Sequence, residues 1–172
     1  MSQLSALSLA IGILGAVATF IFLKVGGILI WAAFVAWGCF FHCGGNNDAL
    51  RNTIVGNVFG ALVATIAAIV ILAVPLGDSL GLPLWAAIVV GVTVWALCMA
   101  ANIKALSVIP ASVYGYACTF AFLLQTKDAL SVAALTSPSL GNAFVAVALS
   151  MIIGALFGFA SGKAGAALGP KA

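Results

Sequence analysis

Three side chains with metal-binding chemistry, Cys39, His42 and Cys43, lie within little more than one turn of a helix. Zinc requires four ligands, or three and a water molecule, at defined spacings. His42 is the only histidine and no further ligand cluster accompanies it, so we expect neither a metal site nor a cofactor. His42 is interpreted as an interfacial side chain at a helix end. Because imidazole changes charge near neutral pH, pH-dependent gating is the alternative.

Catalysis finds little further support in the chain. There is no glutamate, and the three aspartates, Asp48, Asp78 and Asp128, lie between apolar stretches. A Ser-His-Asp relay would need a nucleophilic serine beside the histidine, and no serine is close to His42 in the sequence. We therefore expect a protein that is not an enzyme.

The composition is that of a membrane protein. Apolar residues make up 65% of the 172 positions, charged residues make up 5%, and the mean hydropathy is +1.33. A soluble domain has about a quarter of its residues charged, so lipid must be the solvent for most of this surface. The net charge of +3 is dispersed, and no basic cluster suggests binding to nucleic acid.

Uncharged stretches predict six transmembrane helices in one all-α domain over residues 1–172. A bilayer core about 30 Å thick needs roughly 20 apolar residues for each helical crossing. The stretches lie near residues 4–23, 27–43, 53–74, 84–102, 106–124 and 142–162, with the charged residues in the loops. No basic residue precedes the first stretch, so we interpret it as a retained helix rather than a cleaved signal peptide.

The basic residues predict the orientation of these helices, because they concentrate on the cytoplasmic side. With six crossings, the side that holds the N-terminus also holds Arg51, Lys104, Lys163 and Lys171, and the other side holds Lys24 and Lys127. Both termini are therefore expected in the cytoplasm.

A weak internal similarity recurs at an offset of 79 or 80 residues. Residues 30–41 align with residues 109–120, Gly12 with Gly91, Lys24 with Lys104, and Asp48-Ala49-Leu50 with Asp128-Ala129-Leu130. The units, about 4–74 and 84–162, would each contain three helices, so the second would be inverted in the membrane. Inverted repeats are common in transporters, with the solute site between the halves. Coincidence within a small apolar alphabet is the alternative.

Polar and aromatic residues on the second and fifth helices are candidates for lining a solute path. Ser112, Tyr116 and Thr119 share one face of the fifth helix, and Trp37 and Phe40 occupy equivalent positions on the second. Hydroxyls would replace part of a solute's hydration, and rings would restrict its size. Asn57 and Asn142 are further candidates, because an amide in hydrocarbon needs a partner. Ordinary helix packing is the alternative interpretation.

Small residues recur every fourth position on the third and sixth helices. The columns contain Gly56 and Gly60 on one helix, and Gly154, Gly158 and Gly162 on the other. Such columns allow two helix backbones to approach closely. We expect them to pack helices together, either within the chain or in a second copy.

The sequence resembles a known family at these related segments. The motifs are Trp31-Ala32-Ala33-Phe34, Phe40-Phe41, Gly44-Gly45, Pro110-Ala111-Ser112, Gly115 and Thr119-Phe120. They resemble small bacterial inner-membrane proteins of the YcdZ type, a domain of unknown function numbered 1097, over nearly the whole chain. The sequence departs from the family pattern at Ala33, Ala36 and Ala111, where glycine is often found. The resemblance implies a bacterial inner-membrane location and brings no substrate.

The expected function is passive transport. Coupled carriers usually place a carboxylate within the membrane, and the predicted spans contain none. We therefore expect a channel or uniporter for a small neutral or weakly charged solute, working as a homo-oligomer in the lipid bilayer. The alternative is a non-transporting scaffold or subunit that docks a partner through its glycine-rich helix faces.

Overall fold

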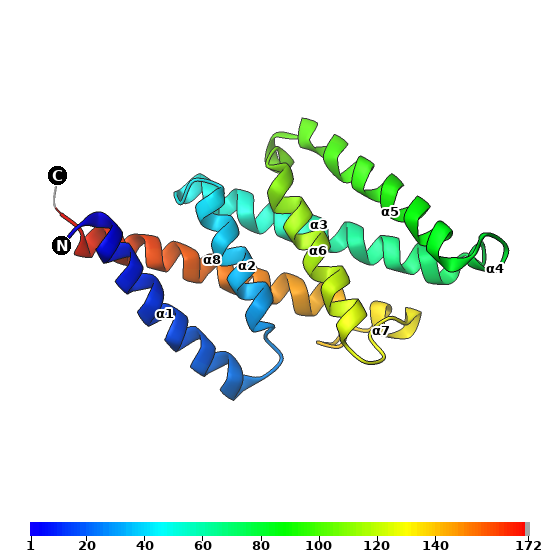
Figure 1. Cartoon of the computed structure of the whole chain (residues 1–172), viewed down its shortest axis with the longest axis horizontal. Helices are drawn as coiled ribbons and strands as arrows, with labels where there is room; N and C mark the ends of the chain where they lie inside the picture. The colour runs from blue at the N-terminus through cyan, green and yellow to red at the C-terminus, as the bar shows by residue number, and fades with distance from the viewer. Residues whose placement is uncertain (171–172) are drawn as a thin grey trace.

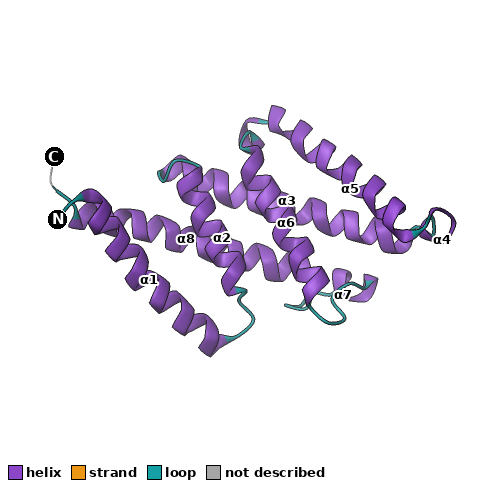
Figure 2. Ribbon diagram, in the orientation of Figure 1, coloured by secondary structure: helices purple, strands orange, loops and turns teal. Residues whose placement is uncertain are grey.

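The computed structural model of the chain describes residues 1–170, and within that range it is helical, without a strand (Figures 1 and 2). Lys171 lies outside the described residues. The long helices are α1 (Gln3–Val25), α2 (Ile30–His42), α3 (Asn47–Ala73), α5 (Leu82–Met99), α6 (Ile109–Gln125) and α8 (Ala143–Leu168). Short helices α4 (Gly77–Leu80) and α7 (Val132–Thr136) and the 3-10 turns η1 (Ala100–Asn102) and η2 (Lys104–Leu106) lie in the connections.

Local capping chemistry sets where several helices begin. The side chains of Ser2 and Asn46 accept hydrogen bonds from the first-turn N–H groups of α1 and α3, and Asn142 does the same for α8. These bonds satisfy backbone donors that have no partner inside the helix. Helices α5 and α6 instead have a proline as their second residue, Pro83 and Pro110, whose missing N–H costs nothing in the first turn.

Several predicted boundaries are wrong by three residues or more. The sixth helix ends at Leu168 rather than 162, so Lys163 lies inside it, and the fifth begins at Ile109 rather than 106. The third helix begins at Asn47 rather than 53, because Asn46 caps it, so Asp48 and Arg51 lie inside a helix and not in a loop. The second begins at Ile30 rather than 27. Gly26 and Gly27, with φ of +70° and +74°, hold a left-handed backbone there that ends α1 and delays α2.

The described residues form an apolar helical bundle of the kind found in membranes. Four segments are long and apolar enough to cross a bilayer: α1, α3, α8, and α5 together with η1. Six full-length spans were expected, but α2 has only 13 residues, and a helix of that length reaches about 20 Å. Helix α6, with 17 residues, is also not among the four segments long enough to cross.

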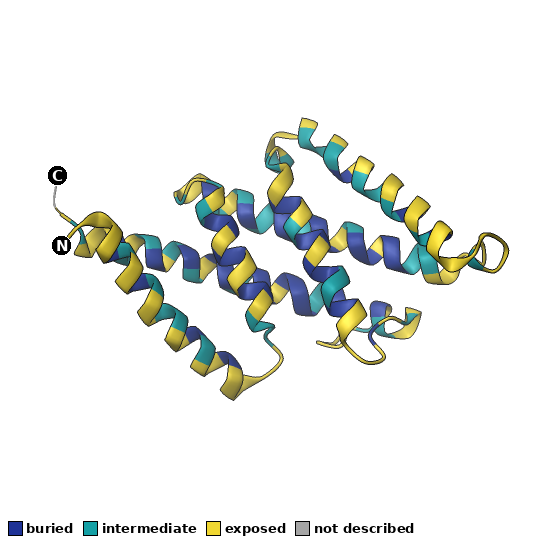
Figure 3. Ribbon diagram, in the orientation of Figure 1, coloured by how far each residue is buried: buried dark blue, intermediate teal, exposed yellow. Residues whose placement is uncertain are grey.

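The outward surface of the bundle is strongly apolar. Figure 3 shows exposed residues along most of α1 and α5 and buried ones concentrated on α3 and α8. The exposed side chains of α1 and α5 include Leu9, Ile13, Val92 and Trp95, the last 66% exposed. An apolar face of this size is unfavourable in water and favourable in lipid, which indicates a membrane protein.

Figure 1 shows how the helices are arranged. Helices α2 and α6 lie side by side in the centre and run in opposite directions, and α3 and α8 cross behind them. Helix α3 packs on α6, α8 packs on α2, and α3 and α8 also touch each other. Helix α1 covers the outside of α8, and α5 covers the outside of α3.

Candidate functional site

The candidate site is a set of buried polar side chains without partners where α3 meets α6. Thr53 and Asn57 lie one turn apart on α3, and Ser112 lies on α6, each at most 1% exposed. The Thr53 hydroxyl, both atoms of the Asn57 amide and the Ser112 hydroxyl make no hydrogen bond. An unsatisfied buried polar group costs about 1–3 kcal/mol. We call these three residues the polar seam.

Glycines bring the two backbones of the polar seam into direct contact. A Cβ atom on Gly60 would overlap the carbonyl oxygen of Ser112, and one on Gly115 would overlap the carbonyl oxygen of Asn57. A Cβ atom on Gly56 would lie 2.5 Å from that of Ala111. Close backbone packing therefore holds Asn57 and Ser112 in place, since neither helix has room for a larger residue at these positions.

A polar cleft of about 320 Å³ opens near one end of the seam. Its lining residues are Asp48, Arg51 and Asn52 from the first turns of α3, and Lys104, Ala105 and Ser107 from the segment before α6. Thr53 and Ser112 follow these lining residues within about one turn on each helix. The charged groups thus line this cleft, which we call the mouth of the seam, whereas the seam itself carries only neutral polar groups.

Helices α2 and α8 meet in a similar way but leave no orphan polar atoms. A Cβ atom on Gly154 would overlap the carbonyl oxygen of Ala33, and one on Gly158 would press on the Phe40 ring. The indole N–H of Trp37 donates to the Ser161 hydroxyl at 2.9 Å, and that hydroxyl donates to the carbonyl of Gly158. The polar groups of this second contact are therefore satisfied.

The residues expected to line a path occupy these two separate contacts. Trp37 and Phe40 pack against α8, while Ser112 and Tyr116 pack against α3. The aromatic residues and the hydroxyl residues thus contact different helices.

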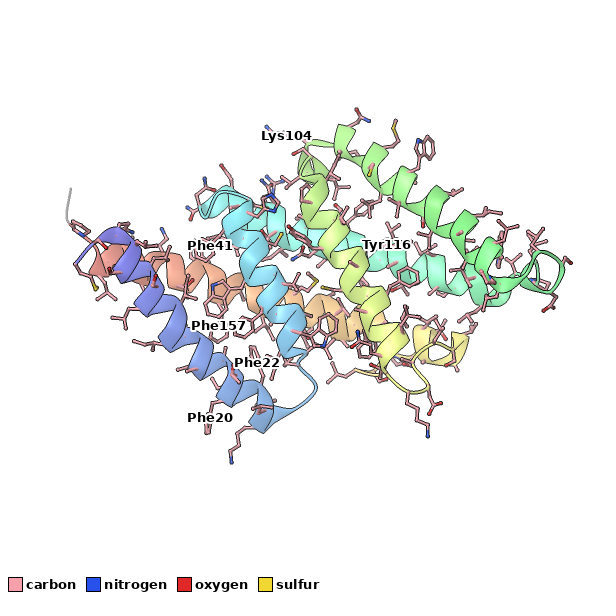
Figure 4. The ribbon with its side chains drawn as sticks, in the orientation of Figure 1. Phe20, Phe22, Phe41, Lys104, Tyr116 and Phe157 are labelled. Atoms are coloured by element: carbon pink, nitrogen blue, oxygen red, sulfur yellow. The ribbon has the colours of Figure 1, made fainter. Side chains whose placement is uncertain are left out.

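Several of these side chains are held by their own hydrogen bonds. Tyr116, labelled in Figure 4, lies within the bundle, and its hydroxyl is 2.9 Å from that of Thr93 on α5. The Thr119 hydroxyl donates to the carbonyl of Gly115, one turn back in α6. The Asn142 amide donates to the carbonyls of Leu135 and Ser137 and thereby fixes the loop that contains α7.

The glycine columns are used within the chain. Gly56 and Gly60 face α6, and Gly154 and Gly158 face α2. A Cβ atom added to Gly162 would lie 3.6 Å from the Phe40 ring. The faces that carry Gly56, Gly60, Gly154 and Gly158 are thus covered by the protein itself, whereas Gly162 also lines a cleft of about 420 Å³.

The comparisons with known proteins identify the family. A sequence model described as a protein of unknown function (DUF1097) matches residues 8–166. The chain belongs to the DUF1097 family. No curated protein and no solved structure matches it.

This DUF1097 protein also brings two thiols together at the end of α2. The Sγ atoms of Cys39 and Cys43 lie 3.9 Å apart. The neighbouring ring of His42 is engaged elsewhere, because its Nδ1 atom lies 2.9 Å from the Tyr114 hydroxyl of α6.

Thr53 of this DUF1097 protein was not predicted as a site residue from the sequence. Placing the start of the third helix at residue 53 made this threonine look like a terminal residue. The spacing did carry a signal. Thr53 and Asn57 are four positions apart, and each is followed three positions later by a glycine, Gly56 and Gly60 respectively. Residues at these spacings share one helix face.

Proposed function

We propose that this DUF1097 protein lets a small uncharged polar solute pass through the membrane, without catalysis, where two inverted three-helix halves meet. One observation carries the proposal: the seam formed by Thr53, Asn57 and Ser112 is buried within a membrane bundle, and the amide of Asn57 and the hydroxyl of Ser112 have no partners in the protein. A passing solute with its own donors and acceptors would satisfy them.

The pairing of the helices supports an inverted repeat. The first half would be α1, α2 and α3, and the second would be α5, α6 and α8. The contact of α3 with α6 then has its counterpart in that of α8 with α2, and α5 on α3 has its counterpart in α1 on α8. The opposite directions of α2 and α6 agree with such an arrangement (Figure 1).

Equivalent glycine contacts support the same relation and revise its alignment. Gly60 meets the carbonyl of Ser112, and Gly154 meets that of Ala33. Ser112 and Ala33 are 79 residues apart, as in the sequence alignment, but Gly60 and Gly154 are 94 apart. The second half therefore has extra residues before α8, where α7 lies. The alignment of Asp48 with Asp128 does not carry over, because Asp128 lies in a turn after α6.

The chemistry of the seam favours an uncharged solute. An amide and two hydroxyls can each donate and accept hydrogen bonds, so they can replace the hydration of a neutral polar molecule. An ion at this depth would need a charged partner, and the charged groups nearest the seam, Asp48, Arg51 and Lys104, line the cleft at its mouth. Because the glycine contacts leave little room, passage requires a local separation of α3 from α6.

We also propose that this mouth faces the cytoplasm of a bacterial cell, with both termini on the same side. Asp48 lines the cleft that contains Arg51 and Lys104 and also a cleft of about 420 Å³ that contains Lys163. Three basic residues thus gather at one end of the bundle, as cytoplasmic ends require.

Flux measurements on the full chain in liposomes test the proposal. We expect water, urea or formamide to equilibrate faster than in empty liposomes, while sodium and chloride do not. Asn57→Leu, which replaces the amide by an apolar group of similar size, should abolish the added flux. Asn102→Leu is the matched control, since its amide is exposed, bonds to the Met99 carbonyl and belongs neither to the seam nor to the lining of the cleft.

Two results would overturn the proposal. One is no flux above empty liposomes for any small uncharged solute when the protein is shown to be folded and inserted. The other is a flux that Asn57→Leu and Asn102→Leu reduce equally, because a path through the polar seam must distinguish these two amides.

A further inference from the structure

The pair of thiols at the end of α2 is not explained by solute passage. Cys39 is buried and Cys43 is half-buried, and their Sγ atoms face each other at 3.9 Å. Two sulfur atoms at this distance are close to the separation at which one soft metal ion bonds to both. Soft thiol ligands select copper(I) or zinc over hard ions.

The surroundings exclude the common alternative, a zinc site. Zinc takes four ligands, or three and a water molecule. Over residues 1–170, no group of three or more histidine, cysteine, aspartate or glutamate side chains is placed to hold a metal ion. His42, which lies between the two cysteines in the sequence, is directed to the Tyr114 hydroxyl. Two sulfurs alone suit a soft monovalent ion that accepts two-coordinate binding.

A second observation points to a ligand at this place. The hydroxyl of Thr53 lies beside both thiols, the residue is fully buried, and yet the hydroxyl makes no well-formed hydrogen bond. A hydroxyl in this position can donate to a metal-bound sulfur and so orient it, as outer-shell groups do at other metal sites.

We propose that Cys39 and Cys43 bind one soft monovalent metal ion of the copper(I) class, with Thr53 as the group that supports the sulfurs. Two sulfur–metal bonds form, and the thiol protons leave to solvent. The metal stays in its reduced state, so no oxidant takes part. Cys43, at the half-buried end of α2 beside Gly44 and Gly45, is where the ion enters. The inference revises the expectation from the sequence that these residues hold no metal. It shares Thr53 with the polar seam, but copper binding can be tested without any transport.

Titration of the purified full chain with copper(I) tests the site. The protein is reduced in mild detergent, its four thiols are counted with a thiol reagent, and copper(I) is added without oxygen against a coloured chelator. We expect one copper per chain. Cys39→Ser and Cys43→Ser should each lose it, and Thr53→Val should weaken binding about 10-fold. Cys98→Ser, on α5, is the matched control and should bind as the unaltered chain does.

A second measurement on the unaltered chain guards against misfolded variants. Copper(I) should protect Cys39 and Cys43 from alkylation by a maleimide, read by mass spectrometry, while Cys98 reacts as before. The proposal is overturned if the reduced chain binds no copper at this stoichiometry. It is also overturned if Cys39→Ser and Cys43→Ser bind as well as Cys98→Ser, or if copper leaves the alkylation of both thiols unchanged.

Discussion

Gly115 of α6 rests directly on the carbonyl oxygen of Asn57 in α3. The contact joins two helices that are more than 30 residues apart in the chain, and it leaves no room for a side chain. It fixes the backbone of Asn57 while the amide of the same residue has no hydrogen-bond partner. A direct backbone contact and an unsatisfied amide thus occur at one residue.

Gly115→Ala should destabilise the bundle. The added Cβ would overlap the Asn57 carbonyl, which belongs to a helix backbone and cannot move aside. Overpacking of this kind costs about 1–3 kcal/mol or more. Thermal unfolding in detergent measures the loss. Gly91→Ala is the control, because nothing lies within 4 Å of its Cβ position, and an unchanged Gly115→Ala protein would show that α3 and α6 are not packed this closely.

Gly154→Ala should cause a loss similar to that of Gly60→Ala. Each new methyl group would meet a backbone carbonyl, that of Ala33 in one case and of Ser112 in the other. Gly12→Ala, on α1, has open space at its Cβ position and should be neutral by comparison. The midpoints of chemical unfolding can be compared directly. A tolerated Gly154→Ala beside a damaging Gly60→Ala would argue against equivalent halves.

Asn57→Leu should stabilise the fold while it blocks passage. Removing an unsatisfied buried amide relieves a cost of about 1–3 kcal/mol, and residues kept for function often reduce stability. Thr119→Val should have the opposite sign, because its hydroxyl donates to the Gly115 carbonyl. Unfolding curves of both variants provide the measurement. A large loss of stability in Asn57→Leu would mean that the amide has a partner in the protein.

Trp37 and Ser161 should show a favourable coupling free energy. The indole N–H donates to the Ser161 hydroxyl at 2.9 Å inside the contact of α2 with α8. A neutral hydrogen bond contributes about 0.5–1.5 kcal/mol. A double-mutant cycle with Trp37→Phe and Ser161→Ala isolates this value. Strict additivity of the two single changes would contradict the bond.

Asn142→Ala should lower stability and leave solute flux unchanged. Its side chain accepts a hydrogen bond from the Phe144 N–H at the start of α8 and donates to two loop carbonyls. Loss of such a cap costs about 0.5–2 kcal/mol. Flux in liposomes and thermal unfolding are measured on the same preparation. A flux reduced as strongly as by Asn57→Leu would instead place Asn142 on the path.

The helical membrane class could be predicted from the sequence, and so could the role of the glycine columns. Uninterrupted apolar stretches such as residues 142–162 report on local solvation, which does not depend on the rest of the fold. Gly60 and Gly154 likewise signalled close backbone contact through their four-residue spacing. The candidate site was predicted only in part: Asn57 and Ser112 were singled out, but Thr53 was missed because the helix start was placed too late.

The sequence by itself determined that lipid surrounds this protein and that its helices pack through small residues, because both properties follow from composition and short-range spacing. The tertiary structure alone decided that α3 pairs with α6 and α8 with α2. It also decided that Asn57 remains without a partner while Trp37 finds Ser161. These outcomes depend on contacts between residues far apart in the chain, where each polar side chain is satisfied or not according to the helix that it faces.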